Sequence, residues 1–328
     1  MALSVAVVGL GRAGSQYGRP PDGIHRSHVG AALATKGIRV AAIFDTDLAR
    51  QKNARETWPE LDELFVGTNL DELPADYVDV IALCTPPVDR LALITTALTK
   101  RPRLLIVEKP LASSAAEGAE IMRCIDDAGV PVRVNFHRSF DSGYREIRAQ
   151  HSGTPQKVIA RYTGGLLSHS SHLVDLFLDW FGPVASVQCV GASDDGMDPS
   201  LTYCCRMEAG FDALVVGMGD LGYDQFECDF LFTDYRIELA NGGVEKRRFA
   251  PISDLYYPGY RQLKEQDCKI KRVGGLKELY ANVRDHLTQR TNLDGCDGER
   301  ALLGIAVLEA ARRSANHGGR REQPILLS

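Results

Sequence analysis

The first 140 or so residues carry their apolar side chains in short, uninterrupted runs. The runs are Leu3–Val8, Val40–Phe44, Val78–Leu83, Leu104–Val107 and Val130–Val134. Because successive positions are apolar instead of alternating with polar ones, the pattern predicts strands that are buried on both faces. Segments with helical spacing lie between the runs, at about 28–36, 47–57, 87–100 and 113–128. Strands that alternate with helices predict a doubly wound parallel sheet.

The rest of the chain has a different rhythm. Apart from helices predicted at about 139–149 and 169–181, strand-like runs follow one another directly, and two helices end the chain. The strands are expected at about 156–162, 184–192, 201–207, 212–218, 226–232 and 235–240, and the last helices at about 275–290 and 297–316. Successive strands predict an antiparallel or mixed sheet. We therefore expect one α/β domain over residues 1–138, and over residues 139–328 an α+β domain with a large, mostly antiparallel open sheet.

The composition is that of a globular protein. Of 328 residues, 44% are hydrophobic and 25% charged, which argues against disordered, collagen-like and coiled-coil classes. The net charge of −5 gives no basic footprint for nucleic acid. No stretch approaches the ~18 apolar residues of a membrane span, so no membrane partner is expected. The eight cysteines show no Cys-x-x-Cys spacing, which favours a reduced, cytoplasmic location.

A glycine-rich segment follows the first predicted strand directly. Its glycines, Gly9, Gly11 and Gly14, have the spacing G-x-G-x-x-G, with Arg12 and Ala13 between them. Gly9 would allow a tight turn, Gly11 the close approach of a pyrophosphate, and Gly14 close packing of helix on strand. The anion would lie at the helix N-terminus. In this context the motif predicts a Rossmann domain that binds a dinucleotide.

Asp45 ends the second predicted strand, where such domains place an acidic residue. It lies 31 residues after Gly14, more than the usual ~20. Residues 16–27 account for the excess, because their two prolines and two glycines interrupt the first crossover helix. A carboxylate here accepts bonds from ribose hydroxyls and repels a 2′-phosphate, so NAD is favoured and NADP disfavoured. Arg50 lies along the next helix, and we interpret it as a surface residue.

Two motifs end the third and fourth predicted strands: Cys84-Thr85-Pro86-Pro87 and Val107-Glu108-Lys109-Pro110. Both lie at the carboxyl ends of strands, the edge at which open α/β sheets bind ligands. Together with the glycine loop and the strand-rich second half, they resemble the glucose–fructose oxidoreductase / inositol dehydrogenase / rhizopine catabolism (Gfo/Idh/MocA) family. The resemblance extends over essentially the whole chain.

The resemblance implies roles for these motifs. Lys109 would reach both the nicotinamide and the reacting hydroxyl, where an ammonium stabilises developing negative charge. Thr85 and Pro86 would line the nicotinamide side of the cleft. Glu108 would either orient Lys109 or serve as a helix-start carboxylate. At Arg90 the family commonly has a histidine, so no role is carried over.

A second signature runs from Tyr162 to Asp175 and resembles the family's Gly-Gly…Asp-x-Gly-x-His-x-x-Asp segment. It implies that His172 donates or accepts the proton, while Ser168 stands where many members have aspartate. In a helix Ser168, His172 and Asp175 share one face; in a tight helix start Ser168 caps instead. A serine stabilises an imidazolium less than a carboxylate does. Either His172 works with weaker support, or Lys109 and Tyr162 share the proton transfer.

Further residues are candidates for substrate contact. Asn135 and Arg138 follow the last strand of the first domain, at a junction that often contributes such contacts in the family, and His137 is either a contact or structural. In the second signature the candidates are Tyr162, Ser168, His169 and His172. His169 and His172 also form a His-x-x-His pair, but no third ligand stands at suitable spacing, so no metal is expected.

These observations predict an NAD-dependent oxidoreductase. The reaction would be reversible oxidation of a secondary alcohol on a sugar, cyclitol or nucleotide sugar, with hydride passing to or from nicotinamide C4. Two alternatives remain open. One is a non-catalytic regulator of the same fold that senses a dinucleotide, suggested by the loss of aspartate at position 168. The other is an NAD-dependent glycosidase that oxidises C3 transiently.

The second-domain runs around Tyr203, Ala213 and Phe230 do not alternate cleanly between apolar and polar residues. A sheet with one solvated face alternates, so both faces of this sheet are expected to be covered. Helices of the same chain cover one face, and a second subunit would cover the other. We therefore expect a homodimer or homotetramer through this sheet, as the resemblance also implies.

Overall fold

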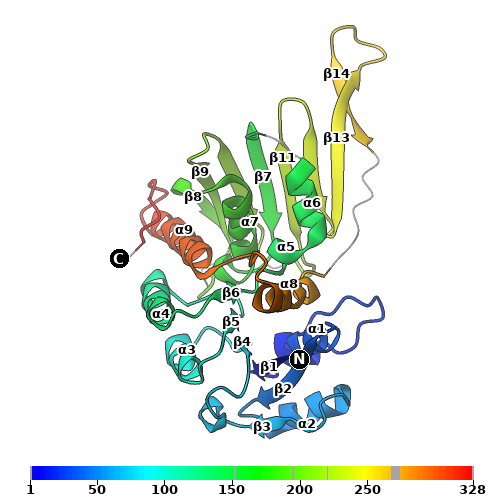
Figure 1. Ribbon diagram of the computed structural model, residues 1–328. Helices are drawn as coiled ribbons and strands as arrows, with labels where there is room; N and C mark the ends of the chain where they lie inside the picture. Colours follow the sequence, from blue (N-terminus) through cyan, green and yellow to red (C-terminus); the bar gives the residue numbers. More distant parts are fainter. Residues whose placement is uncertain (1, 151–152, 194–195, 220, 267–273, 327–328) are drawn as a thin grey trace. The chain divides into compact units, whose positions relative to one another are not determined.

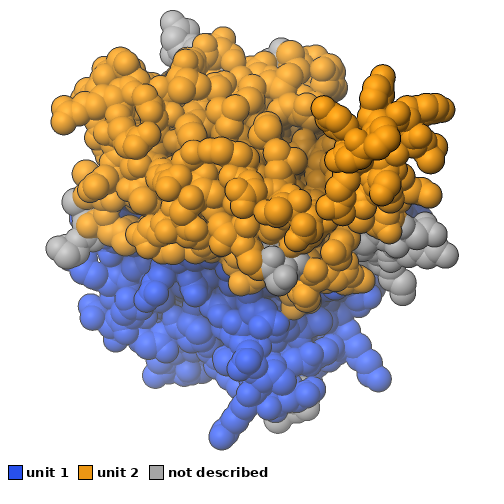
Figure 2. Space-filling model, turned by 90° about the horizontal axis from the view of Figure 1, so that it is seen from above, with its two compact units in different colours: residues 1–142, 273–302, 327–328 blue, residues 143–272, 303–326 orange. Residues whose placement is uncertain are grey.

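The chain folds into two compact units (Figure 2). Residues 1–142, 273–302 and 327–328 make up the first unit, and residues 143–272 and 303–326 the second. The computed structural model describes residues 2–150, 153–193, 196–219, 221–266 and 274–326. The two units are described separately below.

The first unit is built on a six-stranded sheet in the order β3-β2-β1-β4-β5-β6. All neighbouring pairs are parallel, so the predicted doubly wound sheet is confirmed. The strands are β1 (Leu3–Val8), β2 (Ile38–Phe44), β3 (Phe65–Gly67), β4 (Val80–Leu83), β5 (Leu104–Val107) and β6 (Val132–Val134). Of these, β3 is absent from the sequence prediction, because three residues are too few to show a pattern.

Helices connect these strands, and one of them, α4 (Ala115–Ala128), is capped at both ends. The helical elements are η1 (Arg12–Gln16), α1 (His28–Leu33), α2 (Leu48–Thr57), η2 (Leu70–Glu72), α3 (Arg90–Thr99), α4 (Ala115–Ala128), α5 (His137–Phe140) and α8 (Leu276–Gln289). Ser114 caps α4 by accepting a hydrogen bond from Glu117 N, and Gly129 ends that helix in the left-handed conformation.

Helix α8 belongs to the first unit although it lies near the end of the sequence. Leu279, Tyr280 and Val283 pack into the same apolar cluster as Val5 and Ile106. The boundary expected from the sequence assigns residues 139–328 to one domain, whereas in the structure residues 273–302 fold with the first unit. A helical pattern shows which face of a helix is apolar, but not which core that face joins.

The second unit contains a sheet of eight strands in the order β14-β13-β12-β11-β7-β10-β9-β8. Only β10 and β7 pair in parallel, so the predicted large, mostly antiparallel sheet is confirmed. The strands are β7 (Lys157–Tyr162), β8 (Val184–Ala192), β9 (Leu201–Met207), β10 (Asp212–Gly217), β11 (Phe226–Leu231), β12 (Arg236–Ala240), β13 (Glu245–Ser253) and β14 (Arg261–Gln266). The last two are absent from the prediction, since neither the mostly half-buried β13 nor the exposed β14 follows an apolar period.

Helices cover one face of this sheet (Figure 1). They are α6 (Ser142–Gln150), η3 (Leu166–Ser170), α7 (Ser171–Phe181) and α9 (Gly298–Asn316). The core lies between helices and sheet and includes Phe177, Trp180 and Val307 together with inward-facing strand residues such as Phe230. Within the described part of the chain, no helix has the length and apolar character needed to cross a membrane.

No helix among the described residues covers the opposite face of the sheet, and the centre of that face is apolar. Cys204, Leu214 and Ile159 stand side by side on β9, β10 and β7. Leu214 and Ile159 are 37% and 40% exposed. We call the row formed by these three residues the open-face row.

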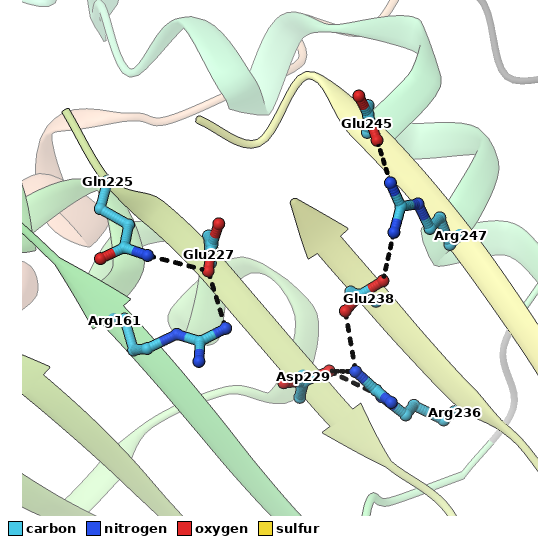
Figure 3. Close-up of polar contacts among 8 residues, drawn as sticks. All are labelled: Arg161, Gln225, Glu227, Asp229, Arg236, Glu238, Glu245 and Arg247. Carbon is cyan, nitrogen blue, oxygen red and sulfur yellow. Dashed lines mark hydrogen bonds and ion pairs between the residues drawn. The ribbon is translucent and has the colours of Figure 1, made fainter. Parts of the chain in front are cut away.

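Ion pairs flank the open-face row toward β13 (Figure 3). Arg161 pairs with Glu227 at 2.7 Å on β7 and β11. Arg236 bridges Asp229 and Glu238 at 2.5 and 2.8 Å. Beyond them, Arg247 pairs with Glu238 at 3.4 Å and with Glu245. Positive and negative charges therefore alternate across this half of the face.

Candidate active site

The glycine loop leaves β1 in a tight turn that glycine alone accommodates. Gly9 has a φ of +90°, and its N–H donates to Phe44 O at 2.7 Å. A side chain at Gly14 would lie 1.9 Å from the carbonyl oxygen of Gly9. By contrast, a Cβ at Gly11 would meet no atom within 4 Å. The loop is thus closely packed at Gly14 and open at Gly11, where a pyrophosphate would approach.

The Asp45 carboxylate is buried at the end of β2 and supports this loop. Its Oδ2 accepts a hydrogen bond from Leu10 N at 2.7 Å, and its Oδ1 accepts one from Asp47 N at 2.9 Å. Arg50 Nη1 lies 3.7 Å from Asp45 Oδ2. Arg50 is an exposed residue of α2, as expected from the sequence, and its guanidinium also lies within ion-pair distance of this carboxylate.

The segment between η1 and α1 is anchored to the end of α2. The first crossover helix stops at Gln16 and resumes at His28, as the proline and glycine content predicts. Arg19 lies over the Trp58 ring, 5.0 Å from its centroid, and pairs with Glu60. Trp58 Nε1 in turn donates to Ser15 O at 3.3 Å.

Arg90 connects the two segments that follow β4 and β5. Its side chain is fully buried, and its guanidinium donates to Thr85 O and, at 2.9 Å, to Glu108 O. Burial lowers the pKa of Arg90, while the charge of Glu108 opposes this effect. A guanidinium can donate to two carbonyls at once. The structure thus shows contacts for Arg90, a residue to which the sequence assigns no role.

Glu108, which precedes Lys109, forms a polar cluster with His28 and Asn135. Its Oε1 accepts hydrogen bonds from His28 Nε2 at 2.9 Å and from Asn135 Nδ2 at 2.6 Å. Burial acts to raise the pKa of Glu108, but the bonds from His28 and Asn135 and the charge of Lys109 outweigh it and lower the pKa. Glu108 is therefore an ionised, buried carboxylate rather than a solvated residue at a helix start.

The segment after β6 completes the cluster. Asn135 is buried and bonded to Glu108. His137 and Arg138, which begin α5, are half-buried. Burial and the charge of Arg138 lower the pKa of His137 to about 3. At neutral pH His137 therefore carries no charge. This favours a structural role for His137 over a role in substrate contact.

In the second unit, Asp198 caps the helical turn that carries the second signature. Its carboxylate accepts hydrogen bonds from Leu167 N at 2.7 Å and from Ser168 N at 3.0 Å. A side chain at Gly165 would collide with this carboxylate. Asp198 is not among the residues expected from the sequence, because the residues it contacts lie about 30 positions earlier in the chain.

Ser168 and His169 lie within the capped turn, and His172 follows in α7. Ser168 Oγ is 2.9 Å from Nδ1 of His169. The His169 ring packs against Gly164, whose φ of +84° requires glycine. The His172 ring contacts Phe226 edge to face, with centroids 6.4 Å apart.

Tyr162 is buried at the end of β7. Its hydroxyl donates to Leu201 O and accepts from Leu201 N, both at 2.9 Å. Burial raises the pKa of Tyr162 to about 12. Such a phenol does not exchange its proton readily near neutral pH, so the alternative in which it shares the proton transfer is not carried further.

The residues of the first unit fit a bound NAD. The loop is open at Gly11, and the buried Thr85 hydroxyl has no hydrogen-bond partner within the described residues. Gly9 to Gly14, with Arg12 and Ala13, would hold the pyrophosphate and Asp45 the ribose. Thr85, Pro86 and Lys109 would face the nicotinamide. Among the described residues, no group of three or more metal-type side chains is placed to hold an ion.

Comparison with known proteins identifies related sequences. Residues 3–136 match the GFO_IDH_MocA family model, described as an oxidoreductase family with an NAD-binding Rossmann fold. The chain is 28% identical over 159 residues to the myo-inositol dehydrogenase Hyg17 of Streptomyces leeuwenhoekii. That match covers 45% of this chain and 41% of the relative, so it spans about two fifths of the relative's length.

Solved structures resemble the chain over nearly its whole length. The WlbA dehydrogenase of Bordetella pertussis, in complex with NADH and UDP-GlcNAcA, has a TM-score of 0.77 at 18% identity, with 100% of this chain and 99% of that chain covered. An oxidoreductase from Agrobacterium radiobacter, in complex with NAD+, L-tartaric acid and magnesium, has a TM-score of 0.75 at 19% identity, with 98% of each chain covered. At these identities the likeness concerns the fold.

Substituting two of the three loop glycines should separate packing from cofactor binding. Gly14→Ala places a methyl 1.9 Å from Gly9 O, so we expect the free energy of unfolding to fall by at least about 3 kcal/mol. Gly11→Ala meets no neighbour and should change stability by less than about 1 kcal/mol, yet weaken NAD binding by about tenfold or more. Denaturant unfolding and calorimetric titration measure the two effects. An equal loss of stability in both variants would contradict the assignment.

Proposed function

We propose that this chain, which belongs to the Gfo/Idh/MocA oxidoreductase family, is an NAD-dependent enzyme that oxidises or reduces a secondary alcohol. The substrate would be a sugar, cyclitol or nucleotide sugar. The proposal rests above all on Lys109, which follows the buried, ionised Glu108 at the carboxyl end of β5. The same unit carries the glycine loop and Asp45.

NAD supplies the hydride acceptor at nicotinamide C4. The chain's own residues bind and orient: the loop around Gly11 receives the pyrophosphate, and Asp45 accepts from the ribose hydroxyls. Lys109 donates a hydrogen bond to the substrate oxygen and stabilises the negative charge that develops there, as the hydroxyl proton leaves in oxidation or as hydride adds to the carbonyl carbon in reduction. His172 is the proposed proton carrier of the second unit, held in α7 next to the turn that Asp198 caps.

The substrate class is supported by what related proteins are named for. One curated relative is a myo-inositol dehydrogenase, and one solved neighbour contains NADH and UDP-GlcNAcA. The two small molecules in these names, myo-inositol and UDP-GlcNAcA, both have secondary hydroxyl groups on a six-membered ring. The dinucleotide-sensing regulator and the NAD-dependent glycosidase remain alternatives, and the product formed in an assay distinguishes the three.

Lys109→Ala should reduce turnover while sparing the cofactor. A panel of sugars, cyclitols and nucleotide sugars, followed by absorbance of the reduced nicotinamide, identifies a substrate. On that substrate we expect turnover to fall by about 10²–10⁴-fold, because the lysine acts mainly in the transition state, with NAD affinity changed by no more than a few fold. Lys52→Ala, at an exposed lysine of α2, is the control. Near-normal turnover in Lys109→Ala would reject the role.

His172→Ala tests the second proposed catalytic residue in the same assay. We expect a severe loss of turnover that partly recovers at high pH, since hydroxide can replace a missing base. His317→Ala, at a histidine exposed on the surface of the second unit, is the matched control. A variant that retains its activity at every pH would exclude His172 from proton transfer.

Asp45 should set the preference for NAD over NADP. We expect the wild-type chain to bind NAD more tightly, because the carboxylate repels a 2′-phosphate. Asp45→Ala should narrow the gap, with Arg50 then available to the phosphate. Asp47→Asn, at the exposed carboxylate two residues on, should leave the ratio unchanged. Calorimetric titration of both dinucleotides measures the ratio, and equal affinities in the wild type would contradict the proposal.

The open-face row is the proposed subunit contact. A two-fold axis brings an identical patch against itself, and here an apolar centre is flanked by charges of both signs that can pair across such an axis. We propose a homodimer, or a homotetramer built from such dimers.

The double variant Ile159→Asp/Leu214→Asp tests this contact, because it buries two carboxylates in the centre of the row. Light scattering at micromolar concentration should give a dimer or tetramer for the wild type and a monomer of 35.9 kDa for the variant. Leu48→Asp, at an exposed leucine of the first unit, should leave the assembly intact. A monomeric wild type would overturn the proposal.

A further inference from the structure

A chain of hydrogen bonds runs from α8 to the carboxylate beside Lys109. Tyr280 OH is 2.9 Å from Nδ1 of His28, and His28 Nε2 is 2.9 Å from Glu108 Oε1. The rings of Tyr280 and His28 also meet edge to face, with centroids 5.8 Å apart at an angle of 78°. Asn135 donates to the same carboxylate oxygen. The four residues come from four separate segments of the first unit.

The chain of bonds is largely buried, and only its Glu108 end reaches solvent. His28 and Tyr280 have no exposed surface, and the Glu108 side chain is 13% exposed. An ionised carboxylate only accepts hydrogen bonds, so His28 Nε2 must carry a hydrogen. The Tyr280 hydroxyl can donate or accept, and it therefore satisfies Nδ1 whether or not that atom is protonated.

His28 can hold a positive charge in this position. Burial by itself lowers its pKa, but Cys84, Tyr280 and Glu108 outweigh the burial and raise the pKa well above its usual value. Of these three neighbours, Glu108 is the one that carries a full negative charge near neutral pH. The geometry agrees with a charged His28, since its Nε2 lies 2.9 Å from Glu108 Oε1.

The other charged and titratable groups around the pair are few. Lys109 follows Glu108 and interacts with its charge, and Arg90 bonds to Glu108 O from α3. His137 stays neutral, as described above. Cys84, at the end of β4, faces His28 with a buried thiol.

We propose that His28 and Tyr280 are positioning residues for Lys109: they fix the Glu108 carboxylate in place, and the His28 imidazolium offsets its charge. The proposal rests on the proposed function only for the chemical role of Lys109. A single carboxylate beside Lys109 would favour the ammonium form strongly. A carboxylate paired with an imidazolium presents little net charge, so it competes less with the substrate oxygen for the Lys109 ammonium.

The pH at which Lys109 becomes reactive tests this directly and needs no substrate. Lysines of the full chain are labelled with trace acetic anhydride from pH 6 to 11, and mass spectrometry gives the labelling midpoint of Lys109 relative to Lys52. His28→Gln should raise the Lys109 midpoint by about one pH unit, because the Glu108 charge is no longer offset. Tyr280→Phe should shift it in the same direction by less.

Two further variants separate charge from structure. In His28→Gln/Glu108→Gln both charges are absent, so the midpoint should return toward the wild-type value, which a displaced loop would not do. His317→Gln removes the imidazole of an exposed histidine–glutamate pair in the second unit and should leave the midpoint unchanged. An unchanged midpoint in folded His28→Gln, or no return in the double variant, would overturn the proposal. Where His28→Gln does not fold, Tyr280→Phe decides by the same shift.

The pH dependence of stability gives a second readout. A histidine with a raised pKa contributes stability that is fully present below its unfolded value of ~6.5 and is lost as pH rises through its folded pKa. The difference in melting temperature between wild type and His28→Gln should therefore be largest near pH 6 and shrink toward high pH. A constant or growing difference would contradict a charged His28.

The two readouts are independent of the proposed function. A shifted Lys109 midpoint in a chain that oxidises no alcohol would leave the positioning roles intact and reject the dehydrogenase. If turnover depends on Lys109 but the Lys109 labelling midpoint does not shift in His28→Gln, the dehydrogenase stands and the positioning roles are rejected.

Discussion

The buried carboxylate of Glu108 is the constraint on which the candidate site depends. A buried charge left without partners costs about 3–5 kcal/mol, so this side chain is tolerated only where donors reach it. His28 and Asn135 supply those donors, and Tyr280 orients His28 from α8. The return of α8 to the first unit late in the sequence therefore serves the site as well as the apolar core that it completes.

A second buried charge contacts the segment that follows β5. The Arg90 guanidinium bonds to the backbone carbonyls of Thr85 and Glu108, and it has no exposed surface. His28 and Asn135 thus hold the side chain of Glu108, and Arg90 holds its backbone carbonyl. Lys109 follows immediately, and a lysine with four rotatable bonds benefits from a backbone that cannot move.

In the second unit, a carboxylate from elsewhere in the chain accepts hydrogen bonds from backbone N–H groups. The turn that carries Ser168 and His169 begins with backbone N–H groups that need acceptors, and Asp198 provides one carboxylate for two of them. The chain therefore has a carboxylate at this turn although position 168 is a serine. It contacts the backbone of Ser168, and it reaches the turn from a different part of the sequence.

The sequence by itself determined the parts of this protein that rest on local patterns. Continuous apolar runs predicted β1, β2, β4 and β5, and alternation of strands with helices predicted the parallel sheet. The glycines at 9, 11 and 14 and Asp45 were found because their spacing along the chain carries the signal, and the Glu108–Lys109 pair because its motif at a strand end resembles that of a known family. The tertiary structure alone decided the places of His28, Arg90, Tyr280 and Asp198, the unit that α8 joins, and the pairing of β13 with β14. The physical reason is that a buried charge or an orphan N–H finds its partner through space, and residues up to 252 positions apart in the chain meet in these contacts.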